Sequence, residues 1–234
     1  MKILAIGDFH GKVPVKLRKA IEKEHLDLII GLGDYAGIED WRPYVLHCFA
    51  SKKTGVRKSP EEFFGKAKFR KLMKKDFNGG EKALNFLDSL DVPFVSIFGN
   101  GDEEWFDYPF GEGIWELNAG RVEYLKGLKN FKDITYGVSN RRGVSILGLG
   151  GYIDAKANYS DEEKESLGYL DVLARLDATR KKLDSLVRKL NHKNRIFVFH
   201  YSVKGVFDVV NEKGNIYNGL SVGVDFFRDV VLKE

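Results

Sequence analysis

The stretch KILAIGDFHG, residues 2–11, contains the pattern that decides the fold. Its first half is an apolar run typical of a buried strand, and its second half, Gly7-Asp8-Phe9-His10-Gly11, is a polar loop bounded by glycines. The pattern recurs where LDLIIGL (26–32) runs into Gly33-Asp34 and where VPFVSIF (92–98) runs into Gly99-Asn100-Gly101-Asp102. Because parallel strands that are buried on both faces read as near-continuous apolar runs, these segments predict a parallel sheet.

The elements between and after these strands predict an α/β protein with two sheets. Helices are expected over about 14–25 and 80–90, and this strand–helix alternation implies right-handed crossovers. In the second half, short strands are expected at 121–125, 133–137 and 144–151, with a hairpin between the last two. A long helix is expected from the capping box Ser160-x-x-Glu163 to about Asn191. A strand at 195–200 and an amphipathic stretch at 222–234 follow. Residues 1–234 are therefore interpreted as a single domain.

The composition is that of a globular protein and excludes several other classes. Hydrophobic residues make up 43% and charged residues 31% of the 234 residues, which argues against a disordered chain. No apolar run is long enough for a signal peptide or a membrane span, so we expect no membrane partner. Cys48 is the only cysteine, which makes a reducing cytoplasm the simplest location. Many Lys and Glu residues with few Cys and Met favour a thermophilic source.

Charge is spread unevenly along the chain. The net charge is only 38 − 34 = +4, but residues 50–76 contain ten basic residues and three acidic ones. This segment lies within an expected insertion at about 41–78, where Phe63, Phe64 and Phe69 are interleaved with the basic residues. One interpretation is a solvated helical insertion with its phenylalanines packed inward. The other is a positive surface that attracts a phosphate-bearing or polyanionic substrate.

Side chains with metal-binding chemistry follow four of the predicted strands. Asp8 and His10 follow the first, Asp34 the second, Asn100 the third, and His200 the last. Open α/β sheets bind ligands beyond the carboxyl ends of their strands, so we expect these side chains to converge at one edge. Carboxylate and amide oxygens together with neutral imidazole suit Mn, Fe, Zn or Co rather than Ca. Each residue alone has a plainer interpretation, as a turn residue or a buried core histidine.

Taken as a set, these motifs resemble a known family. Asp-x-His-Gly, Gly-Asp, Gly-Asn-x-Asp and a later strand-end His occur here in the order found in the calcineurin-like metallophosphoesterase superfamily, from Asp8 to His200. The resemblance implies an α/β fold of four layers, an α/β/β/α sandwich in which helices flank two mixed sheets. It also implies two divalent metal ions, which would be Mn, Fe, Zn, Co or Ni, with Mn favoured.

The resemblance assigns the metal ligands residue by residue. Asp8 and His10 would bind the first ion, Asp34 would bridge both ions, and Asn100 and His200 would bind the second. A hydroxide shared by the two ions would then attack phosphorus directly, without a covalent enzyme intermediate.

Further residues are candidates for catalysis and substrate binding. Asn100 would contact the phosphate as well as a metal ion, and Asp102 would orient a ligand or a loop from behind it. Within the insertion, Lys52, Lys53 and Arg57 are candidates for binding the substrate.

The sequence departs from the family pattern in two places. Gly101 stands where family members commonly carry a His that helps to protonate the leaving alkoxide, so we expect poor leaving groups to react slowly. Family members also carry a further strand with a Gly-His-x-His motif, and no histidine follows His200 in this sequence. Each ion would then lack one imidazole, and we expect weaker metal binding and low activity.

Two functions follow from these observations. The first is a metal-dependent phosphoesterase that hydrolyses phosphodiesters or activated phosphomonoesters. The alternative is a weakly active or inactive phosphoesterase fold that binds nucleic acid or another polyanion through the basic insertion.

Overall fold

The N-terminal half of the chain forms a parallel sheet. The structure, a computed structural model, describes residues 1–54, 58–105, 119–151, 153, 164, 167–211 and 217–234. The strands of this sheet, in spatial order, are β1 (Ile3–Ile6), β2 (Leu28–Gly31), β3 (Phe94–Ser96) and β4 (Phe131–Asp133). Every neighbouring pair is parallel. The expectation of two mixed sheets is therefore wrong for this sheet.

A second, mixed sheet follows. It contains β5 (Tyr136–Arg141), β6 (Val144–Leu149) and β7 (Asn194–Phe199) in that spatial order. The strands β5 and β6 form the expected antiparallel hairpin, which turns at Arg142 and Gly143, and β7 pairs with β6 in parallel. The C-terminal end of β7 therefore points the same way as that of β6.

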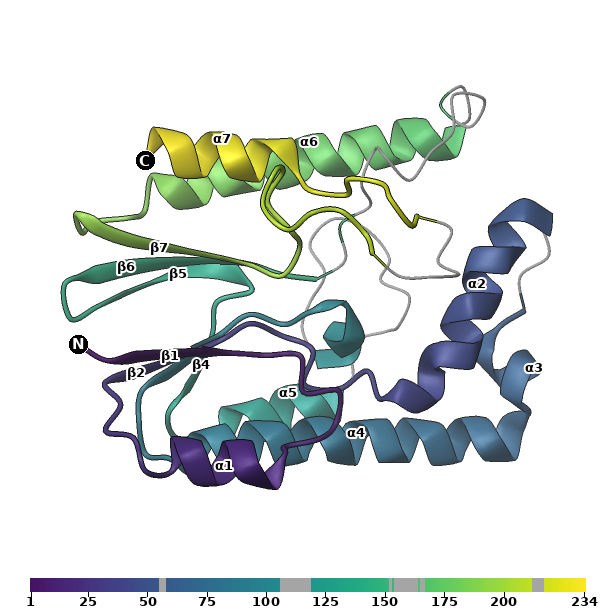
Figure 1. Ribbon diagram of the computed structural model, residues 1–234, viewed down its shortest axis with the longest axis horizontal. Coiled ribbons are helices and arrows are strands. Elements are labelled where there is room, and N and C mark those ends of the chain that lie inside the picture. The colour runs from purple at the N-terminus through teal and green to yellow at the C-terminus, as the bar shows by residue number, and fades with distance from the viewer. Residues whose placement is uncertain (55–57, 106–118, 152, 154–163, 165–166, 212–216) are drawn as a thin grey trace.

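Helices cover the outer faces of both sheets (Figure 1). On the parallel sheet lie α1 (Val15–Ile21), α4 (Lys66–Asp88) and α5 (Ala119–Lys126), and on the mixed sheet lie α6 (Leu167–Val187) and α7 (Asp225–Lys233). Beyond the strand ends come η1 (Glu39–Trp41), α2 (Arg42–Thr54), α3 (Pro60–Phe64) and η2 (Asn100–Trp105). None of the helices within the described ranges combines the length and the apolar content that crossing a membrane requires.

Alternating side chains build a core on each face of the parallel sheet. Ile29 and Phe94 pack against the helices α1 and α4, whereas their neighbours Ile30 and Val95 pack between the two sheets. All four are at most 3% exposed. Because both faces are covered, apolar residues occupy successive positions of β2 and β3, which explains the apolar runs. A third cluster joins β6 to α6 and α7.

Three predicted boundaries differ from the structure. Residues 121–125, expected as a strand, lie in α5, where Arg121, Tyr124 and Leu125 turn inward at helical spacing. The helix expected at 80–90 begins much earlier, at Lys66, so the basic segment and this helix are continuous. The strand expected at 133–137 is divided between β4 and β5.

The link between the two sheets and the start of α6 complete the description. The chain crosses from one sheet to the other at 134–135, where the amide of Ile134 donates to Ser96 and that of Phe98 donates to Oγ1 of Thr135. The capping box at Ser160 and Glu163 lies outside the described residues, and the helix that follows is described from Leu167.

Candidate metal centre

The loops after β1 and β2 continue to pair after the strands end. The amide of Asp8 donates to the carbonyl of Gly33 (2.9 Å), and the amide of His10 donates to the carbonyl of Asp34 (3.0 Å). Asp8, His10 and Asp34 all adopt left-handed backbone conformations, with φ of 54°, 46° and 54°. Asp and His tolerate this region better than most residues, but such strain persists only where the surroundings enforce it. Three strained candidate ligands therefore meet in one pair of loops.

The first half of the site contains Asp8, His10 and Asp34. Their ligand atoms all lie within 4.8 Å of one another. Nε2 of His10 is 3.9 Å from Oδ1 of Asp8 and 3.8 Å from Oδ2 of Asp34. The structure therefore brings together the three residues that the sequence assigned to one ion.

The second half contains Asn100, His200 and the other oxygen of Asp34. Nε2 of His200 lies 2.9 Å from Oδ1 of Asn100 and 3.4 Å from Oδ1 of Asp34. The same Asp34 oxygen accepts a hydrogen bond of 2.8 Å from the amide of Gly101. One carboxylate thus turns one oxygen toward His10 and the other toward His200, and all five predicted ligands converge.

Backbone carbonyls determine which ring nitrogen of each histidine carries a proton. A carbonyl only accepts, so Nδ1 of His10 donates to Gly37 (2.8 Å) and Nδ1 of His200 donates to Leu32 (3.0 Å). In the neutral rings the Nε2 lone pairs then face oxygens of the neighbouring carboxylates. Lone pairs that converge in this way repel one another unless a cation lies between them. The donor set therefore fits divalent metal ions, and the two carbonyls orient the ligands.

Glycine is required at one position of the loop after β3, Gly99, and a second glycine, Gly101, leaves little room for a side chain. A Cβ on Gly99 would lie 2.1 Å from Oδ1 of Asp34 and 2.5 Å from Cε1 of His200, which no side chain can satisfy without displacing a ligand. A Cβ on Gly101 would lie 3.1 Å from Cα of Gly37 and 3.2 Å from Oδ1 of Asp34. Gly101 thus brings its own amide, rather than a side chain, up to Asp34.

Asp102 ties the loops together from behind the ligands. It is fully buried, and its carboxylate accepts hydrogen bonds from the amides of Ala36 (2.8 Å) and Gly99 (2.9 Å). Burial and the nearby negative charge of Asp34 raise the pKa of Asp102 to about 7. Asp102 lies in the position expected of a residue that orients the loops carrying Asp34 and Asn100.

The structure does not describe the side chains of the basic residues that the sequence suggested for substrate binding. Lys52 and Lys53 belong to α2, but their side chains are outside the described part of the chain, as is all of Arg57. His47, a conceivable replacement for the missing proton donor, is engaged elsewhere, since its ring stacks on Phe63 and its Nε2 accepts from the amide of Lys58.

Sequence reasoning missed three groups that hold the site. The carbonyls of Leu32 and Gly37 carry no side-chain signal, because any residue has a carbonyl. Asp76 on α4 is 8% exposed, and its Oδ1 accepts from the amide of Ile38 (2.8 Å), directly beside Gly37. Asp76 could have been noticed in the sequence as an acidic residue on the apolar face of a basic helix, one turn after Leu72.

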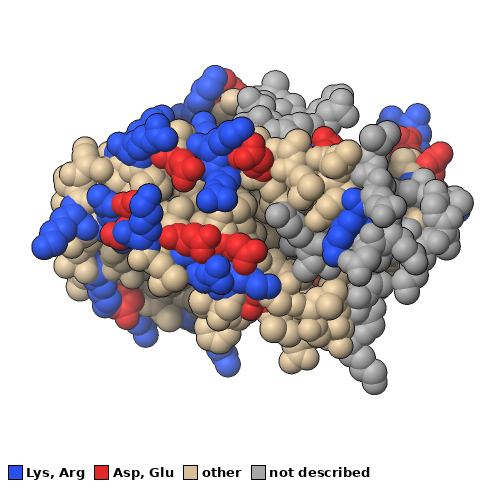
Figure 2. Space-filling model, turned by 90° about the horizontal axis from the view of Figure 1, so that it is seen from above, with Lys and Arg blue, Asp and Glu red and all other residues tan. Residues whose placement is uncertain are grey.

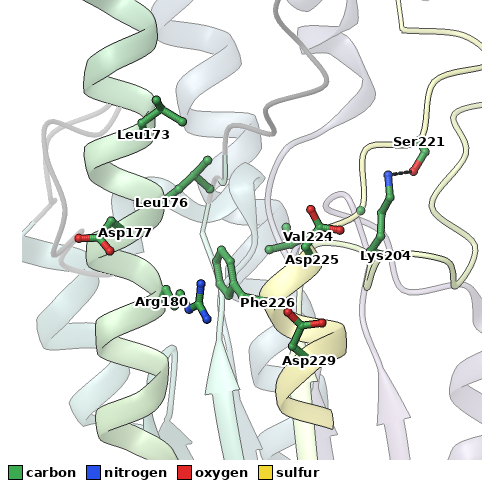
Figure 3. A pocket seen from close by; sticks show the side chains of 11 residues that line it. Leu173, Leu176, Asp177, Arg180, Lys204, Ser221, Val224, Asp225, Phe226 and Asp229 are labelled. Carbon is green, nitrogen blue, oxygen red and sulfur yellow. Dashed lines mark hydrogen bonds between the residues drawn. The ribbon is translucent and has the colours of Figure 1, made fainter. Parts of the chain in front are cut away.

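A separate pocket of about 560 Å³ lies between α6, α7 and the segment after β7 (Figure 3). Its lining includes Asp177, Asp225 and Asp229 beside Arg180 and Lys204, and it contains none of the candidate ligands among the described residues. Nζ of Lys204 already donates to Ser221. These nearly balanced charges do not favour a phosphate ester there.

Comparison with known proteins identifies a shared fold and no function. No protein-family model matches the chain, and no curated protein matches it. One solved crystal structure, for which no protein is named, matches 99% of this chain and 79% of its own at 13% identity, with a TM-score of 0.64. The protein TT1561 of Thermus thermophilus matches 99% of this chain and 76% of its own at 16% identity, with a TM-score of 0.49. The first likeness establishes a common fold.

Proposed function

We propose that this protein is a metal-dependent phosphoesterase that acts on phosphodiesters or activated phosphomonoesters. The observation that carries the proposal is the Asp34 carboxylate, which turns one oxygen toward Asp8 and His10 and the other toward His200. A carboxylate shared by two groups of nitrogen and oxygen donors is suited to hold two cations close together.

The chemistry divides between the ions and the chain. Two bound divalent ions would supply an activated water and neutralise charge on the phosphoryl oxygens. Asp8 and His10 would hold one ion and Asn100 and His200 the other, while Asp34 would contact both. Asp102 and the carbonyls behind the histidines would keep these side chains in place, which limits the rearrangement that binding requires.

The site favours substrates with good leaving groups. Gly101 has no side chain that could give a proton to the departing oxygen, and Gly37 fills the space beside it. General acid catalysis typically contributes about 10²–10⁴ in rate, so esters of basic alkoxides would lose that contribution. Aryl and other activated esters need it least.

Hydrolysis of bis-p-nitrophenyl phosphate by Mn²⁺-loaded protein tests the proposal. Asp34→Asn removes the shared charge and should lower kcat/KM by at least about 100-fold. Isothermal titration with Mn²⁺ should show two ions bound by the wild type and fewer by the variant.

Asp91→Asn is the matched control, because Asp91 is exposed, lies outside the site and has nearly the same backbone φ of 53°. The control should match the wild type in both measurements. Turnover that is unchanged in Asp34→Asn, or a wild type that binds no Mn²⁺, would refute the proposal.

A further inference from the structure

The N-terminal half of α4 is a strongly basic surface helix. Six exposed cations, Lys66, Lys68, Arg70, Lys71, Lys74 and Lys75, lie within its first ten residues. The only acid in that part of the helix is Asp76, which is buried. Its carboxylate faces inward and does little to offset the exposed charge.

Three of these cations form a row along one side of the helix. Lys68, Lys71 and Lys75 are spaced i, i+3 and i+7, which places them on one flank, and we call them the lysine row. Lys75 pairs with Asp40 (2.6 Å), and Lys12 also acts on the Asp40 carboxyl, lowering its pKa together with Lys75. Lys12 follows His10 by two residues, so the row continues to the loop of the metal centre.

The helix is anchored directly at that loop. Oδ1 of Asp76 accepts from the amide of Ile38, and a Cβ on Gly79 would lie 2.6 Å from Cα of Gly11. From Asp76 to Lys68 the helix rises about 12 Å, at about 1.5 Å per residue. The lysine row therefore leads outward from the metal centre at a fixed orientation.

Aromatic packing holds the outer end of the helix in place. Trp41 packs edge-on against Phe64 and Phe69, with ring centroids 5.7 Å and 6.2 Å away. The ammonium group of Lys68 lies 5.0 Å from the centroid of the Phe64 ring. The cations are thus presented from a packed unit made of η1, α3 and α4, of which α3 and the adjoining end of α4 lie at the right of Figure 1.

On the opposite side of the molecule, basic and acidic side chains are mixed. On the face formed by α6 and α7, Lys and Arg side chains alternate with Asp and Glu (Figure 2). Several of them pair within a helix, among them Arg175 with Asp171 and Lys181 with Asp177. On α4, by contrast, Lys75 pairs with Asp40, but no carboxylate of the described residues lies within ion-pair distance of Lys71 in the row or of Lys66, Arg70 and Lys74 beside it. A polyanion would therefore be attracted to α4 rather than to that face.

We propose that the lysine row binds a single strand of nucleic acid and leads its backbone into the metal centre. A strand offers repeated phosphates for the row and a phosphodiester for the site, so the assignment rests on the proposed function. A single strand is favoured over a duplex because Asp34 and His200 are recessed, with side chains 7% and 10% exposed, and a single strand can bend to reach them.

Fluorescence anisotropy with a labelled oligothymidylate of about 20 nucleotides tests the proposal. The measurements are made in EDTA, between about 50 and about 200 mM salt, so that they are independent of hydrolysis. The triple variant Lys68→Gln, Lys71→Gln, Lys75→Gln should bind at least about tenfold more weakly at low salt. The slope of log K against log salt should fall in magnitude by about 2, since each lost phosphate contact contributes about 0.7.

The matched control replaces three exposed lysines at the far end of the molecule, Lys189, Lys193 and Lys233, with Gln. It changes the net charge equally and should bind within about twofold of the wild type. Equal losses in both triple variants, or binding of the wild type to phosphatidylserine-rich vesicles in preference to the oligonucleotide, would overturn the proposal. If the protein binds the oligonucleotide through the lysine row but shows no metal-dependent hydrolysis, the proposed phosphoesterase activity is refuted while the binding role of the lysine row stands.

Discussion

The two halves of the candidate metal centre both combine an imidazole nitrogen with oxygen donors, but their histidines are enclosed to different degrees. The side chain of His10 is 46% exposed and that of His200 is 10% exposed. Asp8 and Asn100 are both exposed, and Asp34, which both halves share, is 7% exposed. A carbonyl orients each histidine and Asp102 supports both loops, but Gly99 packs closely on the His200 half, against Asp34 and His200. Because less order must be gained on binding in an enclosed site, we expect the His200 half to bind its ion more tightly.

The largest loss of metal binding is expected from a substitution at Gly99, which packs directly against Asp34 and His200. Gly99→Ala would place a methyl group on Asp34 and His200, so metal binding should be lost and unfolding free energy should fall by about 1–3 kcal/mol from overpacking. Isothermal titration with Mn²⁺ and urea unfolding measure the two quantities. Gly137→Ala is the control, since the nearest atom to its added Cβ is 3.4 Å away. A Gly99→Ala protein that binds Mn²⁺ normally would show that the enclosure is not rigid.

Removing one imidazole at a time tests the comparison directly. His200→Ala should weaken the tighter Mn²⁺ site by about 100-fold or more, whereas His10→Ala should weaken the other site by about tenfold. The physical reason is that the His10 side chain is already 46% exposed, so water can take its place at the ion with little rearrangement. Competition with a fluorescent chelator gives both affinities, and His192→Ala controls for loss of a histidine outside the site. Equal losses at the two sites would contradict the proposed asymmetry.

A smaller effect is expected from the support behind His10. Asp76→Ala frees the amide of Ile38 and should loosen the turn whose carbonyl holds Nδ1 of His10, so metal affinity in that half should fall by about tenfold. Asp76→Asn keeps an acceptor and should stay near the wild type. The ¹⁵N shifts of the His10 ring report its tautomer and should change in the alanine variant alone. An alanine variant that is less stable but keeps the wild-type tautomer would limit Asp76 to a role in folding.

The same carboxyl gives the smallest effect, a pH dependence of stability. Burial is the main cause that raises the pKa of Asp76, so the folded protein holds this proton more tightly than the unfolded chain does. Its contribution to stability is therefore full below the unfolded pKa of about 3.9 and is lost as pH rises through the folded pKa. The free energy of unfolding, measured with urea at several pH values across this range, should decline less steeply with pH in Asp76→Asn than in the wild type. Parallel plots of unfolding free energy against pH for the two proteins would contradict the assignment.

Local sequence patterns are sufficient to indicate which residues could meet. Apolar runs that stop at glycine and a polar residue identify β1, β2 and β3 and place Asp8, Asp34 and Asn100 beyond their ends. This inference succeeds because strand burial and chain direction are local properties that constrain nearby residue types. The sequence also identified the basic segment, since charge composition needs no coordinates.

The orientation and support of those residues depend on contacts between distant parts of the chain. The tautomers of His10 and His200 depend on the carbonyls of Gly37 and Leu32, which are distant in sequence and carry no side-chain signal. Residues 121–125 have the composition of a strand but fold as part of α5, because Tyr124 and Leu125 pack into the core beside α4. The lysine row likewise lies near the candidate site only because Asp76 and Gly79 bring α4 against the loops of Ile38 and Gly11. Such long-range contacts arise from packing between elements, which local sequence patterns do not encode.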